Sequence, residues 1–455
     1  MKRYYSIILA TVLILSACTN SQRSKQVDTP ASFTPLEWSN DAVMYEVNVR
    51  QFTPEGTFNA FATHLPRLEG LGVEILWFMP IHPIGEKNRK GTLGSYYSIK
   101  DYKAVNPEFG TFDDFKSLVA KAHKMGFKVI IDCVANHTSW DNEWIKNHEN
   151  WYTKDSLGNI IPPVADWSDV ADLNYDNLEM RAAMLDAMKY WVAEADIDGY
   201  RCDYAGGVPT DFWEDARASL DSIKPVFMLA EDQDHLALLN KAFDCNYGWT
   251  MHHYMNEIYS GEKSVIDIQS YFHQVDSAYP VSTYAVQFTS NHDENSWNGT
   301  VYERLGDAVK TFAVLSFTVP GMPLIYSGQE AGLNTRLEFF EKDEIDWNRA
   351  PEMTDLYSRL IDLKKKNKAL WNGTAGGKIV FLDTSEPKKL MAFKREKDGN
   401  SVFVIMNLSP EDLEGSVYSL RENDLTEYFT GEKLTLGSDD IISLKPWEYR
   451  IYEKK

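Results

Sequence analysis

Two stretches of the sequence decide the fold: VEILWFMP at residues 73–80 and KVIIDCVA at residues 128–135. Both are nearly unbroken apolar runs, a pattern typical of strands that are buried on both faces of a parallel sheet. Between them, residues 112–125 have the apolar spacing of an amphipathic helix. A strand, a helix and a second strand in this order predict a parallel βαβ unit.

The same alternation of short apolar runs and helical segments recurs from residue 43 to about residue 367. Eight such units predict a fold of the α/β class, a (β/α)8 or TIM barrel, which we assign to residues 37–370. The eight runs predicted as strands are residues 43–49, 73–80, 128–135, 199–203, 226–231, 243–247, 284–290 and 323–327.

Two parts of the chain depart from this alternation. Residues 138–177, after the third predicted strand, are rich in Trp, Asp and Asn and are too long for an ordinary barrel loop, so we expect a short inserted B domain there. Residues 371–455 contain short alternating segments and the hairpin signal Asp398-Gly399-Asn400. We expect them to form a C-terminal all-β sandwich domain.

The charge of the chain restricts its partners. Of 455 residues, 67 are acidic and 46 are basic, giving a formal net charge of −21. Nucleic acids and anionic lipid surfaces bind basic faces, so neither is an expected partner. A neutral substrate is unaffected by this charge, and the 13% of aromatic residues is compatible with binding the apolar faces of sugars.

The N-terminus predicts export. Lys2 and Arg3 precede an apolar run at residues 7–15, which is too short to span a membrane, and Leu-Ser-Ala-Cys18 follows. This ending resembles the lipobox of bacterial lipoproteins, and an ordinary signal peptide with a chance cysteine is the alternative. The resemblance implies a signal peptide at residues 1–17, lipidation of Cys18 and a flexible tether at residues 18–36. The protein would then be attached to a bacterial membrane only by this anchor, on the periplasmic side or at the cell surface.

Three other cysteines, Cys133, Cys202 and Cys245, show no metal-ligand spacing. We expect them to be small buried apolar residues.

Polar residues gather where predicted strands end, which is the active face of this type of barrel. One carboxyl group there could protonate a glycosidic oxygen while another attacks or stabilises the sugar cation, so the pattern favours glycosidic cleavage. We expect Arg201 to lower the pKa of Asp203, and burial to raise the pKa of Glu231. The residues are Asp132, Asn136 and His137 after the third strand, Arg201 and Asp203 on the fourth, Glu231 at the end of the fifth, and His292 and Asp293 after the seventh.

These segments resemble the four signatures of the α-amylase superfamily, glycoside hydrolase family 13: DCVANH at 132–137, GYRCD at 199–203, Glu231 after an apolar strand, and SNHD at 290–293. The resemblance covers residues 40 to 455. It implies a retaining α-glycoside hydrolase that cleaves α-glucans, maltooligosaccharides or cyclic dextrins through a covalent glycosyl-enzyme. It further implies a nucleophile at Asp203, a general acid/base at Glu231 and a third carboxylate at Asp293, with Asp132 structural and Tyr97, His137, Arg201 and His292 binding the substrate.

The chain departs from the family pattern at Gly206 and Gly207, where family members commonly carry a Lys-His pair on the acceptor side. This departure favours short maltooligosaccharides or cyclic dextrins over long starch chains as substrates. Asn136 and Asp172 resemble two ligands of the family's calcium site, so a structural Ca²⁺ is a further expectation. The chemistry itself requires no cofactor.

Two other functions stay open at this point. A transglycosylase or isomerase acting on α-glucosides would share the glycosyl-enzyme, and the motifs do not separate it from a hydrolase. A non-catalytic glycan-binding lipoprotein is disfavoured because Asp203, Glu231 and Asp293 are all present. The sequence does not predict the oligomeric state.

Overall fold

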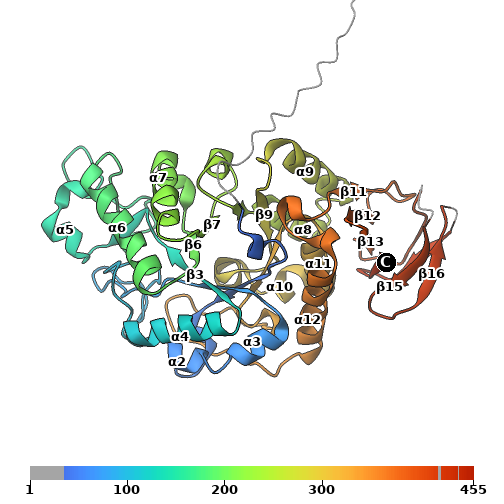
Figure 1. Ribbon diagram of the computed structural model, residues 1–455, viewed down its shortest axis with the longest axis horizontal. Helices are drawn as coiled ribbons and strands as arrows, with labels where there is room; N and C mark the ends of the chain where they lie inside the picture. Colours follow the sequence, from blue (N-terminus) through green and yellow to red (C-terminus); the bar gives the residue numbers. More distant parts are fainter. Residues whose placement is uncertain (1–34, 419–421, 439, 455) are drawn as a thin grey trace, which may run out of the picture.

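The computed structural model describes residues 35–418, 422–438 and 440–454, and eight parallel strands among them close into a barrel (Figure 1). This confirms the predicted fold class, and each strand overlaps one of the predicted runs. The signal peptide, Cys18 and nearly all of the tether lie outside the described residues. In order around the barrel the strands are β1 (Met44–Val47), β2 (Ile75–Phe78), β3 (Lys128–Cys133), β6 (Gly199–Cys202), β7 (Phe227–Ala230), β8 (Cys245–Tyr247), β9 (Tyr284–Gln287) and β10 (Met322–Tyr326).

Every second side chain of a strand points into the barrel. Along β7 and β3 these inward side chains change from apolar to charged toward the carboxyl end of the strand. In β7, Phe227 and Leu229 belong to the apolar cluster inside the barrel, and Glu231 is the next residue on that face. In β3, Ile130 belongs to the same cluster and Asp132 follows it. The carboxyl ends of the strands therefore deliver charged side chains to one mouth of the barrel.

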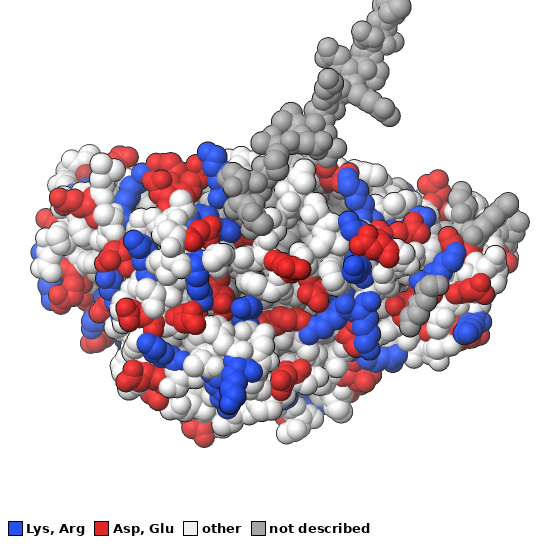
Figure 2. Space-filling model, in the orientation of Figure 1, with Lys and Arg blue, Asp and Glu red and all other residues white. Residues whose placement is uncertain are grey.

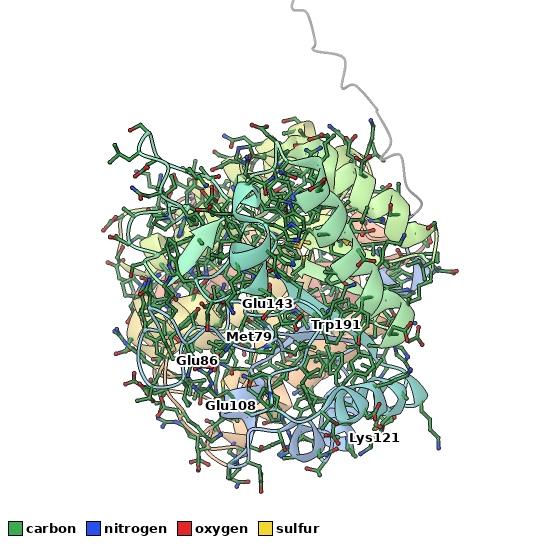
Figure 3. The ribbon with its side chains drawn as sticks, turned by 90° about the vertical axis from the view of Figure 1, so that its left-hand side faces the viewer. Met79, Glu86, Glu108, Lys121, Glu143 and Trp191 are labelled. Atoms are coloured by element: carbon green, nitrogen blue, oxygen red, sulfur yellow. The ribbon has the colours of Figure 1, made fainter. Side chains whose placement is uncertain are left out.

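Helices surround the barrel and bury their apolar faces against it (Figure 1). Trp191, for example, packs edge-on against Phe115, and Figure 3 shows it on the side of the molecule that also carries Lys121. The helices are α1 (Val49–Phe52), α2 (Phe58–Phe61), α3 (Leu65–Leu71), α4 (Phe112–Lys124), α6 (Leu178–Glu194), α7 (Thr210–Asp221), α8 (Trp249–Tyr259), α9 (Val265–Ala278), α10 (Val301–Leu305), α11 (Val309–Thr318) and α12 (Pro351–Lys366).

The segment between β3 and α6 is a small insertion above the barrel mouth. It contains α5 (Glu143–Asn147) and a two-stranded antiparallel sheet of β4 (His137–Ser139) and β5 (Val170–Asp172). The Lys90 ammonium group, in the loop after β2, lies 3.0 Å from a carboxylate oxygen of Asp169 and ties that loop to the insertion.

The C-terminal part is all-β, as predicted. Six antiparallel strands run in the order β11 (Ile379–Phe381), β12 (Leu390–Lys397), β13 (Asn400–Asn407), β18 (Tyr449–Lys454), β15 (Glu422–Glu427) and β16 (Lys433–Leu436). A second sheet pairs β14 (Leu413–Gly415) with β17 (Ile442–Leu444), and apolar side chains from both sheets form one cluster. Asp398 and Gly399 join β12 to β13 with positive φ angles of 49° and 82°, as a type I′ hairpin turn requires.

Cys133, Cys202 and Cys245 are free and buried, which confirms the prediction for them. Burial raises the pKa of the Cys202 and Cys245 thiols well above its ordinary value. Acidic and basic side chains are intermingled over the face shown in Figure 2. Within the described residues, no helix combines the length and the apolar character needed to cross a bilayer.

Candidate active site

A cavity of about 430 Å³ opens at the carboxyl ends of the barrel strands. The structure brings all the predicted catalytic and substrate-binding residues to this mouth, with Arg201 buried beneath it. Aromatic residues from several loops complete the wall. The lining includes Tyr97, His137, Trp167, Asp203, Tyr204, Glu231, Trp249, His292, Asp293, Trp297, Phe339 and Phe340.

Arg201 is the cation around which the carboxyl groups are arranged. Its Nη1 lies 2.8 Å from Asp132 Oδ1 and 3.1 Å from Asp203 Oδ1, and its Nη2 lies 2.5 Å from Glu231 Oε1. The guanidinium also lies 5.1 Å from the centre of the Trp77 ring. Burial alone would lower the pKa of Arg201, but Asp132 and Glu231 raise it well above the ordinary value. The cation is therefore permanent.

The pKa of Asp203 contradicts the expectation from the sequence. Burial raises it to about 7, and Arg201 offsets only part of that shift because Asp132 and Asp293 raise it further. Glu231 behaves as expected: burial raises its pKa to about 7, with Arg201 opposing and Asp203 adding to the shift. One guanidinium thus serves three carboxyl groups, and the charge of Asp203 helps to keep the proton on Glu231.

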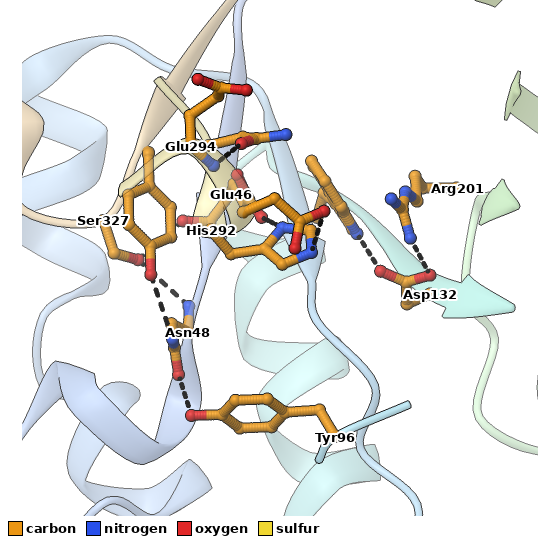
Figure 4. Close-up of polar contacts among 12 residues, drawn as sticks. Glu46, Asn48, Tyr96, Asp132, Arg201, His292, Glu294 and Ser327 are labelled. Atoms are coloured by element: carbon orange, nitrogen blue, oxygen red, sulfur yellow. Dashed lines mark hydrogen bonds and ion pairs between the residues drawn. The ribbon is translucent and has the colours of Figure 1, made fainter. Parts of the chain in front are cut away.

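His292 is held by a carboxylate that the sequence analysis missed. Its Nδ1 lies 2.5 Å from Oε1 of Glu46, a fully buried residue of β1 (Figure 4). Its Nε2 lies 2.7 Å from the Tyr97 hydroxyl and 3.4 Å from Asp293 Oδ2. Burial lowers the pKa of His292, but Asp293 and Glu46 together raise it to about 9. The charged ring donates to both sides at neutral pH.

Tyr97 links this histidine to the arginine cluster. Its hydroxyl donates to Asp132 Oδ2 at 3.1 Å, while its ring is nearly parallel to the His292 ring with centroids 5.3 Å apart. Asp132 also accepts a bond from the Trp77 indole at 3.2 Å. Asp132 is therefore a buried hydrogen-bond partner, as expected, and Tyr97 lies at the floor of the cavity.

A run of aromatic rings continues from Tyr97 out of the cavity. Phe339 lies 6.2 Å from Tyr97 and 5.1 Å from Trp297 between ring centroids, and Trp297 leaves 52% of its surface exposed. Trp297 belongs to the short π-helical segment Glu294–Asn298 after β9, and Phe339 to the loop after β10, and neither segment has a periodic pattern. Their sequence signal was only the high aromatic content.

Comparison with known protein families assigns this constellation. Residues 21–158 and 164–404 match the model of the α-amylase catalytic domain, which is most of the chain. The chain belongs to the α-amylase family of glycoside hydrolases. Residues 379–451 match the C-terminal domain of maltogenic amylases, in agreement with the β-sheets found there.

Individual members of the α-amylase family resemble most of the chain. The crystal structure of a noncanonic maltogenic α-amylase from Thermotoga neapolitana is 30% identical, with a TM-score of 0.82 over 91% of this chain and 98% of that one. A cyclomaltodextrinase from a Bacillus species is 26% identical over 82% of this chain and 74% of its own. The α-amylase MalA of Haloarcula japonica is 27% identical over 82% of this chain, which spans 56% of the length of that relative.

The two predicted calcium ligands, Asn136 and Asp172, lie on neighbouring segments, because Asp172 is the strand partner of His137 in the β4–β5 sheet. Nδ2 of Asn136 lies 3.4 Å from Nδ1 of His137, and burial raises the pKa of Asp172 while the Thr153 side chain bonds to it. In the described part of the chain, no three His, Cys, Asp or Glu side chains cluster in a way that would hold a metal ion. Two oxygen ligands fall short of the six to eight that Ca²⁺ prefers, so the calcium site stays a prediction.

Proposed function

We propose that the chain hydrolyses α-glucosidic bonds with retention of configuration, through a covalent glycosyl-enzyme on Asp203. The observation that carries this proposal is the convergence of Asp203, Glu231 and Asp293 on one cavity around the buried Arg201 cation. An acid and a nucleophile in one water-accessible cavity are the groups that a retaining glycosidase needs.

The reaction follows from these positions. Ionised Asp203 attacks C1 of the sugar while Glu231 gives its proton to the glycosidic oxygen, so the C1–O bond breaks and an ester forms. Water then attacks C1, its proton passes to Glu231, and the Asp203 carboxylate leaves. The charged His292 and Asp293 would bind sugar hydroxyls, and Tyr97 would lie beneath the ring. Every group in this sequence is a side chain or water, so a calcium ion would be structural.

The preferred substrates would be maltooligosaccharides and cyclic dextrins. Support comes from the relatives named as a maltogenic α-amylase and a cyclomaltodextrinase. Further support comes from Gly206 and Gly207, which lack the acceptor-side contacts that the Lys-His pair commonly makes in this family.

Activity should follow a bell-shaped pH profile. The Asp203–Glu231 pair is inactive with two protons, because the nucleophile is neutral, and inactive with none, because the acid is lost. Since burial raises both pKa values to about 7, the alkaline limb of kcat/KM should lie near neutrality rather than near the ordinary value of about 4.3 for Glu. Initial rates on maltotriose from pH 4 to pH 9 measure this, and an alkaline limb near pH 5 would contradict it.

A product profile tests the proposal. The chain from Thr19 onward is incubated with maltoheptaose, a cyclodextrin, pullulan, trehalose and sucrose. Shorter maltooligosaccharides are the expected result, and α-configured fresh products seen by NMR would establish retention. Products longer than the substrate would make the protein a transglycosylase. Binding of maltoheptaose without any turnover would leave a glycan-binding protein and contradict the proposal.

We propose in addition that the protein is exported and carries lipid on Cys18, on the strength of the Leu-Ser-Ala-Cys18 segment. A labelled fatty acid should then enter the full chain and fail to enter a Cys18→Ala variant, and equal labelling of both would refute the anchor.

A further inference from the structure

The residue that follows the proposed nucleophile has an unusual conformation. Tyr204 has φ 42° and ψ 49°, the left-handed region that bulky side chains rarely adopt. Its side chain is also 42% exposed at the cavity. Such strain persists only where the surroundings impose it, and it concentrates at functional sites. The strained backbone of Tyr204 therefore indicates that the position of its ring has a functional role.

Three contacts fix Tyr204. Its backbone N–H donates to Glu231 Oε2 at 2.9 Å, and its ring meets Trp167 edge to face with centroids 5.4 Å apart. The ring also occupies the space beside Gly207, where an added Cβ would lie 2.4 Å from the ring carbons Cδ1 and Cε1. Gly207, which stands at the His position of the family's Lys-His pair, is thus the residue that makes room for the ring.

The hydrogen bond to Glu231 places Tyr204 on the side of the cavity where the leaving group binds. In the reaction proposed above, Glu231 protonates the oxygen of the departing sugar, so that sugar lies on the Glu231 side. The rings of Trp297 and Phe339 follow β9 and β10, two and three strands further round the barrel from β7. Tyr204 follows β6, which is three and four strands from β9 and β10 in the eight-stranded barrel, so these aromatic groups enter the cavity from different sides of the barrel.

The surroundings of Tyr204 favour a neutral sugar. Trp167 and Tyr204 offer uncharged aromatic surface at the cavity. A polar pair lies beside the segment that follows Tyr204, with His235 Nδ1 2.9 Å from Asp232 Oδ2. This pair occupies the space beside Gly206, where an added Cβ would lie 2.2 Å from Asp232 Oδ2. Flat apolar surface edged by hydrogen-bonding groups matches the two kinds of surface that a glucose unit presents.

We propose that Tyr204, with Trp167 beside it, is the binding platform for the glucose unit on the leaving-group side of the scissile bond. This inference rests on the proposed function and specifies the substrate of that site. The same platform receives the sugar that attacks the glycosyl-enzyme in the reverse direction: its hydroxyl oxygen bonds to C1, the C1–Oδ ester bond to Asp203 breaks, and the hydroxyl proton passes to Glu231.

Two substrates that transfer a maltosyl unit to Asp203 test the platform. Maltotetraose cleaved at its central bond loses maltose, whereas α-maltosyl fluoride loses only fluoride, which has no face to stack on a ring. Tyr204→Asn removes the ring, and Asn tolerates the left-handed conformation. It should lower kcat/KM on maltotetraose about tenfold more than kcat/KM on the fluoride.

Two further variants separate the ring from the fold. Tyr204→Phe retains the ring, so the ratio of the two kcat/KM values should stay at that of the wild type. Gly207→Ala displaces the ring without changing Tyr204, so it should shift the ratio in the same direction as Tyr204→Asn. Fluoride release shows that each variant is folded.

The outcomes are distinguishable. Equal losses on both substrates in Tyr204→Asn would overturn the platform, because the residue would then act only through Glu231. An unshifted ratio in Gly207→Ala would also overturn it. A wild-type protein that turns over neither substrate would overturn the proposed function and the platform together.

Discussion

Replacing Asp203 by Asn should abolish the activity while stabilising the protein. The loss of the nucleophile is expected to lower kcat by a factor on the order of 10⁴ or more. The folded state at pH 8 holds Asp203 as a buried anion although burial raises its pKa to about 7. A neutral amide removes the free-energy cost of burying this charge, so the melting temperature at pH 8 should rise by about 2 °C or more.

The stabilisation should depend on pH with a defined sign. The folded-state pKa of Asp203 lies above the unfolded value of about 3.9, so the wild type loses stability as pH rises from 4 to 7. The increase in melting temperature of Asp203→Asn over the wild type should therefore be largest at pH 8 and smaller at pH 4. Thermal unfolding of both proteins at these two pH values measures it. Asp234 is exposed, so Asp234→Asn is the matched control and should change neither kcat nor the melting temperature.

The nucleophilic role of Asp203 has its own readout. In Asp203→Ala, added azide should enter the vacated space, displace fluoride from α-maltosyl fluoride and give a β-configured glycosyl azide. Failure of azide to react, combined with a residual wild-type product profile, would show that another group forms the glycosyl-enzyme.

Replacing Arg201 by Met should have the largest effect on stability. The change leaves Asp132, Asp203 and Glu231 around a cavity without their shared cation. Removing one partner of a buried ion pair typically costs about 3–5 kcal/mol in the free energy of unfolding. Urea unfolding at pH 8 measures this loss. At pH 5 the loss should be smaller, because the carboxyl groups then carry protons.

The activity of Arg201→Met should change in a way that a mere loss of stability does not produce. Arg201 lowers the pKa of Asp203 and of Glu231, so without it both groups hold their protons to higher pH. The acid limb of the pH profile should move to higher pH. Arg181→Met, which removes the cation of an ion pair with the exposed Asp211, is the control and should cost about 1 kcal/mol or less.

The fold could be predicted because its signals are local. Apolar runs such as residues 73–80 and 128–135 are specific to strands covered on both faces, and the Asp398-Gly399 turn specifies its hairpin by backbone conformation alone. The strand period then places Asp132, Asp203 and Glu231 at one mouth. The neighbours of those side chains in space could not be predicted, because they come from other strands.

Glu46 and the pKa of Asp203 illustrate that limit. Glu46 is a single acidic residue inside the strand Met44–Val47, and only the closed barrel shows that it faces His292. Arg201 lies two residues before Asp203, which suggested a lowered pKa. The sequence does not show that Asp132 and Glu231 share the same guanidinium or how deeply Asp203 is buried. The conformation of Tyr204 was equally invisible, since it depends on the space beside Gly207.

The buried cysteines have a practical consequence. Cys133, Cys202 and Cys245 are free, buried thiols, and Cys18 is the one remaining cysteine of the sequence. A chain that starts at Thr19 would therefore expose no thiol to alkylating reagents. One cysteine introduced at a chosen surface position would be the single site for a fluorophore or spin label. Cleft motions could then be followed in solution without first replacing any native residue.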